Sequence, residues 1–189
     1  MKYDFTKPLT NGAKRTLTAF SRNMFVLLSK QSFEEITVGQ LCKAAQYPRA
    51  TFYNYFDDKY DLLNYCWQTL AEQIGLSEYH HAKENEMFYL YLDRIYDFTK
   101  QNEDMIRKIL LHNSEVGYLF FSFRNFLNNK MRFLFSNCPE ALQKDIPNEL
   151  LADHYSNVLF LVWQWAAIKK PNCTKEQAHS YLTQLMLNT

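Results

Sequence analysis

Residues 37–59, TVGQLCKAAQYPRATFYNYFDDK, contain two short helix patterns separated by a break at residues 46–48. Thr37 can cap the first pattern, because its side-chain oxygen can accept from a free amide of the first turn. The apolar residues of this pattern recur at helical spacing and predict one buried stripe, formed by Val38, Leu41, Cys42 and Ala45. Pro48 cannot continue this helix, but it suits the start of the next one.

The second pattern runs from Arg49 to Phe56 and places Phe52 and Phe56 four residues apart on one side. We expect both rings to belong to the core. Hydrogen-bonding side chains occupy the rest of the surface: Arg49, Thr51, Tyr53, Asn54 and Tyr55. A short helix with a buried aromatic side and a polar outer surface is what a helix-turn-helix presents to the DNA major groove. The stretch therefore predicts a helix-turn-helix.

The run from Ala44 to Phe56, followed by DDKYDLL at residues 57–63, resembles the DNA-binding signature of the TetR/AcrR family of transcriptional regulators. In that family a turn with Gly precedes a recognition helix of the form Thr-aliphatic-Tyr-x-Tyr/His-Phe, and Lys-x-x-Leu opens the next helix. The resemblance covers about residues 12–70. Gln46 stands where the family usually has Gly, and a left-handed conformation costs a non-Gly residue about 1 kcal/mol. We expect this turn to be slightly strained or differently shaped.

The resemblance implies DNA contacts from ten residues of this stretch. Arg49, Ala50 and Tyr53 are the candidates for reading bases, since an arginine can bond a guanine edge twice and an alanine can touch a thymine methyl group. The candidates for phosphate contacts are Thr37, Thr51, Asn54, Tyr55 and Lys59. Gln40 and Lys43 are candidates for further contacts. The alternative for each residue is a solvated position on a helix surface.

Composition and charge agree with a helical DNA-binding protein. The 189 residues are 47% hydrophobic and include only four glycines and five prolines, which favours long helices. Residues 1–60 hold nine Lys/Arg and five Asp/Glu (net +4), whereas the remainder holds twelve and fifteen (net −3). The excess of positive charge thus lies on the part expected to meet phosphate.

Several other classes of protein find no support in the sequence. No run of about 18 uncharged apolar residues is present and the N-terminus lacks the apolar core of a signal peptide, so we expect a cytoplasmic protein without a membrane partner. The four cysteines are far apart, which favours reduced thiols. The five histidines give no ligand spacing for a metal, and no nucleophile, phosphate loop or carboxylate pair suggests an enzyme or a cofactor.

The helix patterns predict an all-α chain of about nine helices in two parts. Residues 1–58 form a three-helix head with an N-terminal arm at 1–10, and residues 59–189 form a helical body for regulation and dimerisation. After a first helix at 11–30 and the two short ones, a helix from about residue 59 links the head to the body. The further patterns cover residues 85–101, 103–113, 116–137, 147–169 and 174–187.

The stretch 150–168 is apolar on every side, so it must be covered either by its own fold or by a partner. Together with the apolar stripe of the last helix, it could pair with its copy as a four-helix bundle across a two-fold axis. The resemblance also implies that this final pair of helices is the dimer interface. The predicted interface residues are Leu151, Tyr155, Val158, Leu159, Val162, Trp163, Ala166, Tyr181, Leu182 and Leu185.

We therefore expect a homodimeric DNA-binding transcriptional regulator, most simply a repressor, on a near-palindromic site in double-stranded DNA. A small hydrophobic ligand or a protein partner would act on the body, where aromatic residues either line a pocket or form plain core. One alternative is a co-activator of the same fold that binds a protein instead of DNA. The other is a helical enzyme or ligand carrier.

Overall fold

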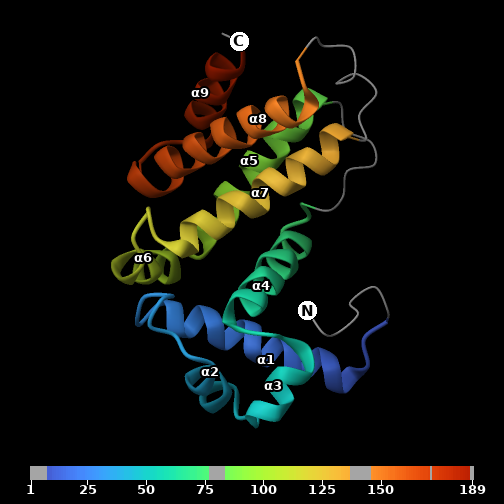
Figure 1. Cartoon of the computed structure of the whole chain (residues 1–189). Coiled ribbons are helices and arrows are strands. Elements are labelled where there is room, and N and C mark those ends of the chain that lie inside the picture. Colours follow the sequence, from blue (N-terminus) through green and yellow to red (C-terminus); the bar gives the residue numbers. More distant parts are fainter. Residues whose placement is uncertain (1–7, 77–83, 137–145, 171, 188–189) are drawn as a thin grey trace. The chain divides into compact units, whose positions relative to one another are not determined.

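The computed structural model describes residues 8–76, 84–136, 146–170 and 172–187, and the regular secondary structure of this part of the chain is helical throughout (Figure 1). The predicted all-α fold is confirmed. Of the predicted arm, residues 1–7 lie outside the described residues. The helices are α1 (Asn11–Leu28), α2 (Val38–Ala45), α3 (Arg49–Tyr55), α4 (Lys59–Gln73), α5 (Glu84–Gln101), α6 (Glu103–His112), α7 (Tyr118–Ser136), α8 (Asn148–Trp163), the π-helix η2 (Gln164–Lys169) and α9 (Lys175–Leu187).

Contacts within the chain divide it into two compact units. The first, called the head below, comprises the chain up to residue 70 together with residues 104–121. The second, called the body, comprises residues 71–103 and 122–189. This division differs from the boundary predicted after residue 58, because most of α4 and residues 104–121, which include nearly all of α6, are grouped with the head.

Aromatic rings beneath α3 form the core of the head, and α2 and α3 lie on the same side of α1 (Figure 1). Phe20 of α1 packs edge-on against Phe52 and Phe56, with ring centroids 5.3 Å and 6.3 Å away. All three rings are fully buried, as are Phe33 and Ile36 of the α1–α2 connection. The prediction that Phe52 and Phe56 are core residues is therefore confirmed.

The end of α6 is tied to the head by one buried amide side chain. The backbone N–H of Phe33 donates to Oδ1 of Asn113 at 2.8 Å, and Nδ2 of Asn113 donates to the carbonyl oxygen of Leu28 at 3.0 Å. The ring of Phe33 also stacks on the ring of Tyr118, with centroids 5.2 Å apart. These contacts explain why residues 104–121 belong to the head, although they follow α5 of the body in the chain.

In the body, α8 and η2 pack against α5 and α9. The indole N–H of Trp163 donates to Oγ1 of Thr99 on α5 at 2.9 Å. Two side-chain contacts hold α9 on α5: the ion pair of Lys175 with Asp97, and the hydrogen bond between His179 and Asp93, each at 2.6 Å. Much of the apolar surface of α8 is thus covered by the protomer itself.

Candidate nucleic-acid interface

The first helix of the helix-turn-helix begins with a reciprocal cap. The backbone N–H of Gln40 donates to Oγ1 of Thr37 at 3.2 Å, and the backbone N–H of Thr37 donates to Oε1 of Gln40 at 2.8 Å. The Gln40 amide also bonds the side chain of Gln31. Thr37 and Gln40 are exposed, and so is Lys43 of α2. Two of the predicted DNA contacts therefore fix the start of α2 while remaining at the surface.

The turn between the two helices has the geometry that the sequence suggested. Gln46 has φ 59° and ψ 38°, and no other non-glycine residue in the described ranges has a positive φ. The backbone N–H of Tyr47 donates to the carbonyl oxygen of Cys42 at 3.0 Å and closes the end of α2. Of the two expectations for this turn, slight strain or a different shape, the first holds: Gln46 adopts the left-handed conformation in the position of Gly and carries the backbone strain.

Helix α3 presents an exposed row above its buried side. Arg49, Ala50, Tyr53 and Asn54 are exposed, with 44% of the surface of Tyr53 accessible. The Tyr53 ring stands edge-on to Phe52, at a centroid distance of 5.5 Å, which fixes its direction. Thr51 and Tyr55 are half-buried at the flanks. The structure thus brings the three predicted base-reading residues together on one surface.

The guanidinium group of Arg49 does not extend straight away from the protein but lies over the first turn of α2. A methyl group built on Gly39 would be 2.8 Å from Nη2 of Arg49. Burial raises the pKa of the neighbouring Cys42 thiol, and the charge of Arg49 opposes that shift. The first residue of α3 is thus in contact with both helices of the motif.

Lys59 occupies a different environment from the other predicted contacts. Its ammonium group donates to the carbonyl oxygens of Phe33, Glu34 and Ile36 at 2.8–2.9 Å. Three donors are available only in the charged form, although burial lowers the pKa of Lys59, with Glu34 and Asp58 opposing that shift. All three N–H groups are occupied, so Lys59 holds the α1–α2 connection. The predicted phosphate contact would require it to give up one of these bonds.

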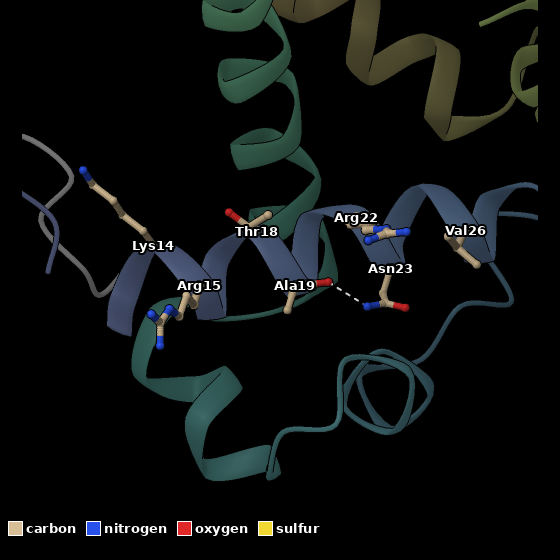
Figure 2. Close-up of a pocket in the computed structure, with 7 residues that line it drawn as sticks. All are labelled: Lys14, Arg15, Thr18, Ala19, Arg22, Asn23 and Val26. Carbon is tan, nitrogen blue, oxygen red and sulfur yellow. Dashed lines mark hydrogen bonds between the residues drawn. The ribbon is translucent and has the colours of Figure 1, made fainter. Parts of the chain in front are cut away.

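A second basic surface lies along α1. Seven residues of α1 line an open groove, and Figure 2 shows their side chains in two rows. One row is formed by Lys14, Thr18 and Arg22, and the other by Arg15, Ala19, Asn23 and Val26. The three cations lie off the buried stripe of α1, and no acid is among the lining residues. We did not predict this groove as part of the site. Its signal in the sequence is the helical spacing of cations at 14, 15 and 22, away from the apolar positions.

The structure revises the predicted dimer interface. Six of its ten residues are buried within the protomer and are therefore not available to a partner: Leu151, Leu159, Val162, Trp163, Ala166 and Leu182. Trp163, for example, packs edge-on against Phe123 and Phe160. Tyr155 and Val158 are half-buried, and Tyr181 and Leu185 are exposed. The sequence showed that α8 must be covered but did not show that its own fold covers most of it.

The body aromatics predicted as a pocket or as core include several buried rings with internal partners. Tyr96 donates its hydroxyl to the carbonyl oxygen of Cys173 at 2.6 Å, and Tyr91 donates to that of Leu76 at 3.1 Å. Phe133, in contrast, is exposed. These contacts favour core packing for the two tyrosines. The ligand pocket stays a prediction.

Residues 25–66 match the model of the family described as "Bacterial regulatory proteins, tetR family". This segment, which contains the helix-turn-helix, resembles the DNA-binding segment of TetR-family proteins. The match includes α2, the turn and α3, which carry the candidate DNA contacts described above, whereas Lys14, Arg15 and Arg22 of α1 precede it. No curated protein matches the chain.

Solved structures extend the likeness in fold to the body. A protein from Syntrophomonas wolfei, described as a TetR-family transcriptional regulator, aligns with a TM-score of 0.64 at 18% identity and covers 93% of this chain and 95% of its own. A TetR transcriptional regulator from Streptococcus agalactiae aligns with a TM-score of 0.61 at 24% identity, covering 91% and 94%. A dihydroxyacetone kinase operon activator aligns with a TM-score of 0.52 at 14% identity, covering 92% and 95%. The whole chain therefore has the fold of TetR-family transcriptional regulators.

Two further observations bear on other functions. Within the described part of the chain, every helix falls short of the length and apolarity that a transmembrane span requires. Among the same residues, no three His, Cys, Asp or Glu side chains are grouped as metal ligands would be.

Proposed function

We propose that this protein is a DNA-binding transcriptional regulator that acts as a homodimer on a near-palindromic operator. The observation that carries the proposal is the exposed row of Arg49, Ala50, Tyr53 and Asn54 on α3, held above the fully buried Phe52. A helix anchored in this way can enter the major groove without rearrangement of the head. Its arginine and asparagine offer hydrogen bonds to base edges or phosphates.

Phosphate contacts would come from the surfaces on both sides of α3. Thr37 and Lys43 are exposed on α2, and Lys14, Arg15 and Arg22 line the groove on α1. Such contacts set the register and make binding depend on salt, because each neutralised phosphate releases counterions. Lys59 is left out of this set, since its three donors already bond the chain.

The surface that we propose for the second copy is the exposed apolar side of the last helices. Leu161 and Trp165 are four residues apart on α8 and η2, and Tyr181 and Leu185 are four apart on α9. Helices α8 and α9 are in contact, so the two pairs can form one continuous apolar surface. Pairing of this surface with its copy would produce a four-helix bundle.

Regulation would act through the body. A small hydrophobic ligand or a protein partner changes DNA occupancy only if it binds the arrangement that fits the operator more or less tightly than other arrangements. Repression is the simplest outcome, because a dimer on an operator blocks the polymerase.

The proposal is tested by selection of bound sequences from random duplexes at low salt, followed by gel shifts with the enriched site. We expect a near-palindrome whose half-sites are about 34–36 Å apart. Arg49→Ala and Tyr53→Ala should each weaken binding by about 1–3 kcal/mol, with the thermal unfolding of the head unchanged. Enrichment of no sequence, or variants that bind like the wild type, would contradict the proposal.

The alternative is a co-activator that binds a protein. It is favoured by the apolar residues at the end of α6 and beyond it, where Leu111 and Val116 have 76% and 93% of their surfaces exposed. No residue of α6 itself is buried. A chain that retains no DNA in the selection, but whose partner binding is lost on Leu111→Asp, would support this alternative.

A further inference from the structure

Gly39 and Arg49 are in contact across the helix-turn-helix. Gly39 is the second residue of α2, and Arg49 is the first residue of α3. A Cβ atom on Gly39 would lie 2.8 Å from Nη2 of Arg49, 3.7 Å from its Cζ and 3.8 Å from its Nε. Real Cβ atoms essentially never show a contact as short as 2.8 Å, so the guanidinium occupies space that only glycine leaves open.

The backbone does not require glycine at this position. Gly39 lies inside a regular helix, and Gly75 is the only glycine in the described residues with a positive φ. Alanine is the better helix former, so glycine here weakens α2 without any gain in backbone conformation. What glycine provides is room for the side chain that crosses from α3.

The guanidinium group of Arg49 is also available for a contact with DNA, because no bond within the described part of the chain would have to break first. Among the described residues, no carboxylate pairs with Arg49 and no hydrogen bond involves its guanidinium. The first turn of α2 carries partial positive charge from its free amides, which does not favour a cation beside it. In the described part of the chain no charged partner holds Arg49 in this direction, and the space left by Gly39 is the feature that permits it.

We infer that Gly39 is a positioning residue of the DNA interface: the absence of its side chain places the Arg49 guanidinium beside α2 and so determines which group on the DNA Arg49 reaches. The inference rests on the proposed DNA-binding function. A methyl group at residue 39 would displace the end of a flexible side chain and not the backbone. The fold is expected to tolerate it.

The test is Gly39→Ala in the full chain, alone and combined with Arg49→Ala, on a duplex that carries the enriched site. In the wild-type background we expect Gly39→Ala to weaken binding about tenfold, because an arginine that bonds a guanine edge depends on its geometry. In the Arg49→Ala background the same change should have an effect of less than about twofold, since the displaced group is already gone. Gly39→Ala should also lose discrimination at the base position where Arg49→Ala loses it.

Gly12→Ala is the matched control. Gly12 is likewise the second residue of a helix that begins after a threonine cap, but a Cβ atom there would meet only Oγ1 of Thr10, at 4.0 Å. Both glycine substitutions should raise the melting temperature by about 1–2 °C through helix propensity. Only Gly39→Ala should change DNA binding. In the protein without DNA, only Gly39→Ala should move the side-chain Nε–H signal of Arg49 in ¹⁵N NMR spectra.

Three results would overturn the inference. The first is a Gly39→Ala variant that binds the enriched site as tightly as the wild type. The second is an equal loss of affinity in both backgrounds, which would mean that the methyl group itself collides with DNA. The third is an Arg49 signal that does not move. A wild-type chain that enriches no sequence would overturn the proposed function as well, so the two failures are distinguishable.

Discussion

Helix α3 of the helix-turn-helix and the C-terminal helix α8 use their surfaces in opposite ways. Within the seven residues of α3 only Phe52 is buried, and four of the other six are exposed: Arg49, Ala50, Tyr53 and Asn54. Seven of the sixteen residues of α8 are buried, and its exposed side includes Leu150 and Leu161. Helix α3 is thus held by a small anchor and offers hydrogen-bonding groups. Helix α8 packs against the rest of the body over most of its circumference and exposes only a narrow apolar strip.

This difference shows which kind of interaction surface can be altered without loss of the fold. On α3 the anchor and the outer surface are formed by different residues, so contacts with a partner can be changed while the head stays folded. On α8 and η2, residues two positions apart belong to the core and to the surface: Trp163 is 7% exposed and Trp165 is 46% exposed. Substitutions there must be chosen residue by residue.

The largest expected effect separates the two tryptophans. Trp163→Asp removes the packing on Phe160 and the bond to Thr99, and it buries a charge, so it should destabilise the body by about 5 kcal/mol or more. Trp165→Asp, the same change on the exposed side, should keep the fold and shift the protein to monomers. Circular dichroism with temperature and sedimentation velocity measure the two effects. A folded monomer from Trp163→Asp would return that residue to the dimer interface.

Asn113→Ala should have the next largest effect, on the head. The substitution leaves the buried N–H of Phe33 and the carbonyl oxygen of Leu28 without this partner, at a cost of about 2–4 kcal/mol. Asn113 is 4% exposed, whereas its neighbour His112 is exposed and serves as a control through His112→Ala. Hydrogen exchange at Phe33 reports the loss locally. Equal stability of the two variants would show that water replaces the amide at no cost.

The variant Lys59→Met distinguishes a structural role of Lys59 from a phosphate contact. The loss of three charge-assisted bonds to carbonyl oxygens should lower the free energy of unfolding by about 2 kcal/mol. Lys108→Met, on an exposed position of α6, should change it by less than about 0.5 kcal/mol. If Lys59 met a phosphate instead, the slope of log affinity against log salt would flatten by about 1 with little change in stability.

The smallest expected effect concerns the turn. Gln46→Gly should stabilise the head by about 0.5–1 kcal/mol, because glycine adopts the observed positive φ without strain. Gln46→Ala removes the same side-chain atoms but keeps a Cβ atom, so it should give no such gain. Thermal unfolding of both variants checks the difference. A stabilisation by alanine equal to that by glycine would place the cost in the glutamine side chain, not in the backbone.

The parts of the molecule that the sequence predicted well are those in which neighbours in the chain are also neighbours in space. The positions of Phe52 and Phe56 follow from helical spacing alone, and the left-handed turn at Gln46 follows from its place after the end of α2. The helix ranges of the body were predicted in the same way, from apolar periodicity and the glycines and prolines that interrupt it.

The rest depended on contacts between distant parts of the chain. The acceptors of Lys59 are 23–26 residues away, and Asn113 bonds Phe33 across 80 residues, so no local pattern marks either role. The apolar residues on every side of α8 indicate that this helix is covered. They do not indicate whether the rest of the chain or a partner covers it. Periodicity could not assign Trp163 to one and Trp165 to the other.

The bond between Asn113 and the α1–α2 connection has a consequence for protein engineering. Because the head is assembled from two separate stretches of chain, we expect residues 1–70 to lose stability when they are grafted as a cassette onto an unrelated C-terminal half. Such a chimaera would lack the amide that holds Phe33 and Leu28. An exchange that keeps the recognition surface intact would have to carry residues 104–121 along with it, or supply an equivalent asparagine from the acceptor protein.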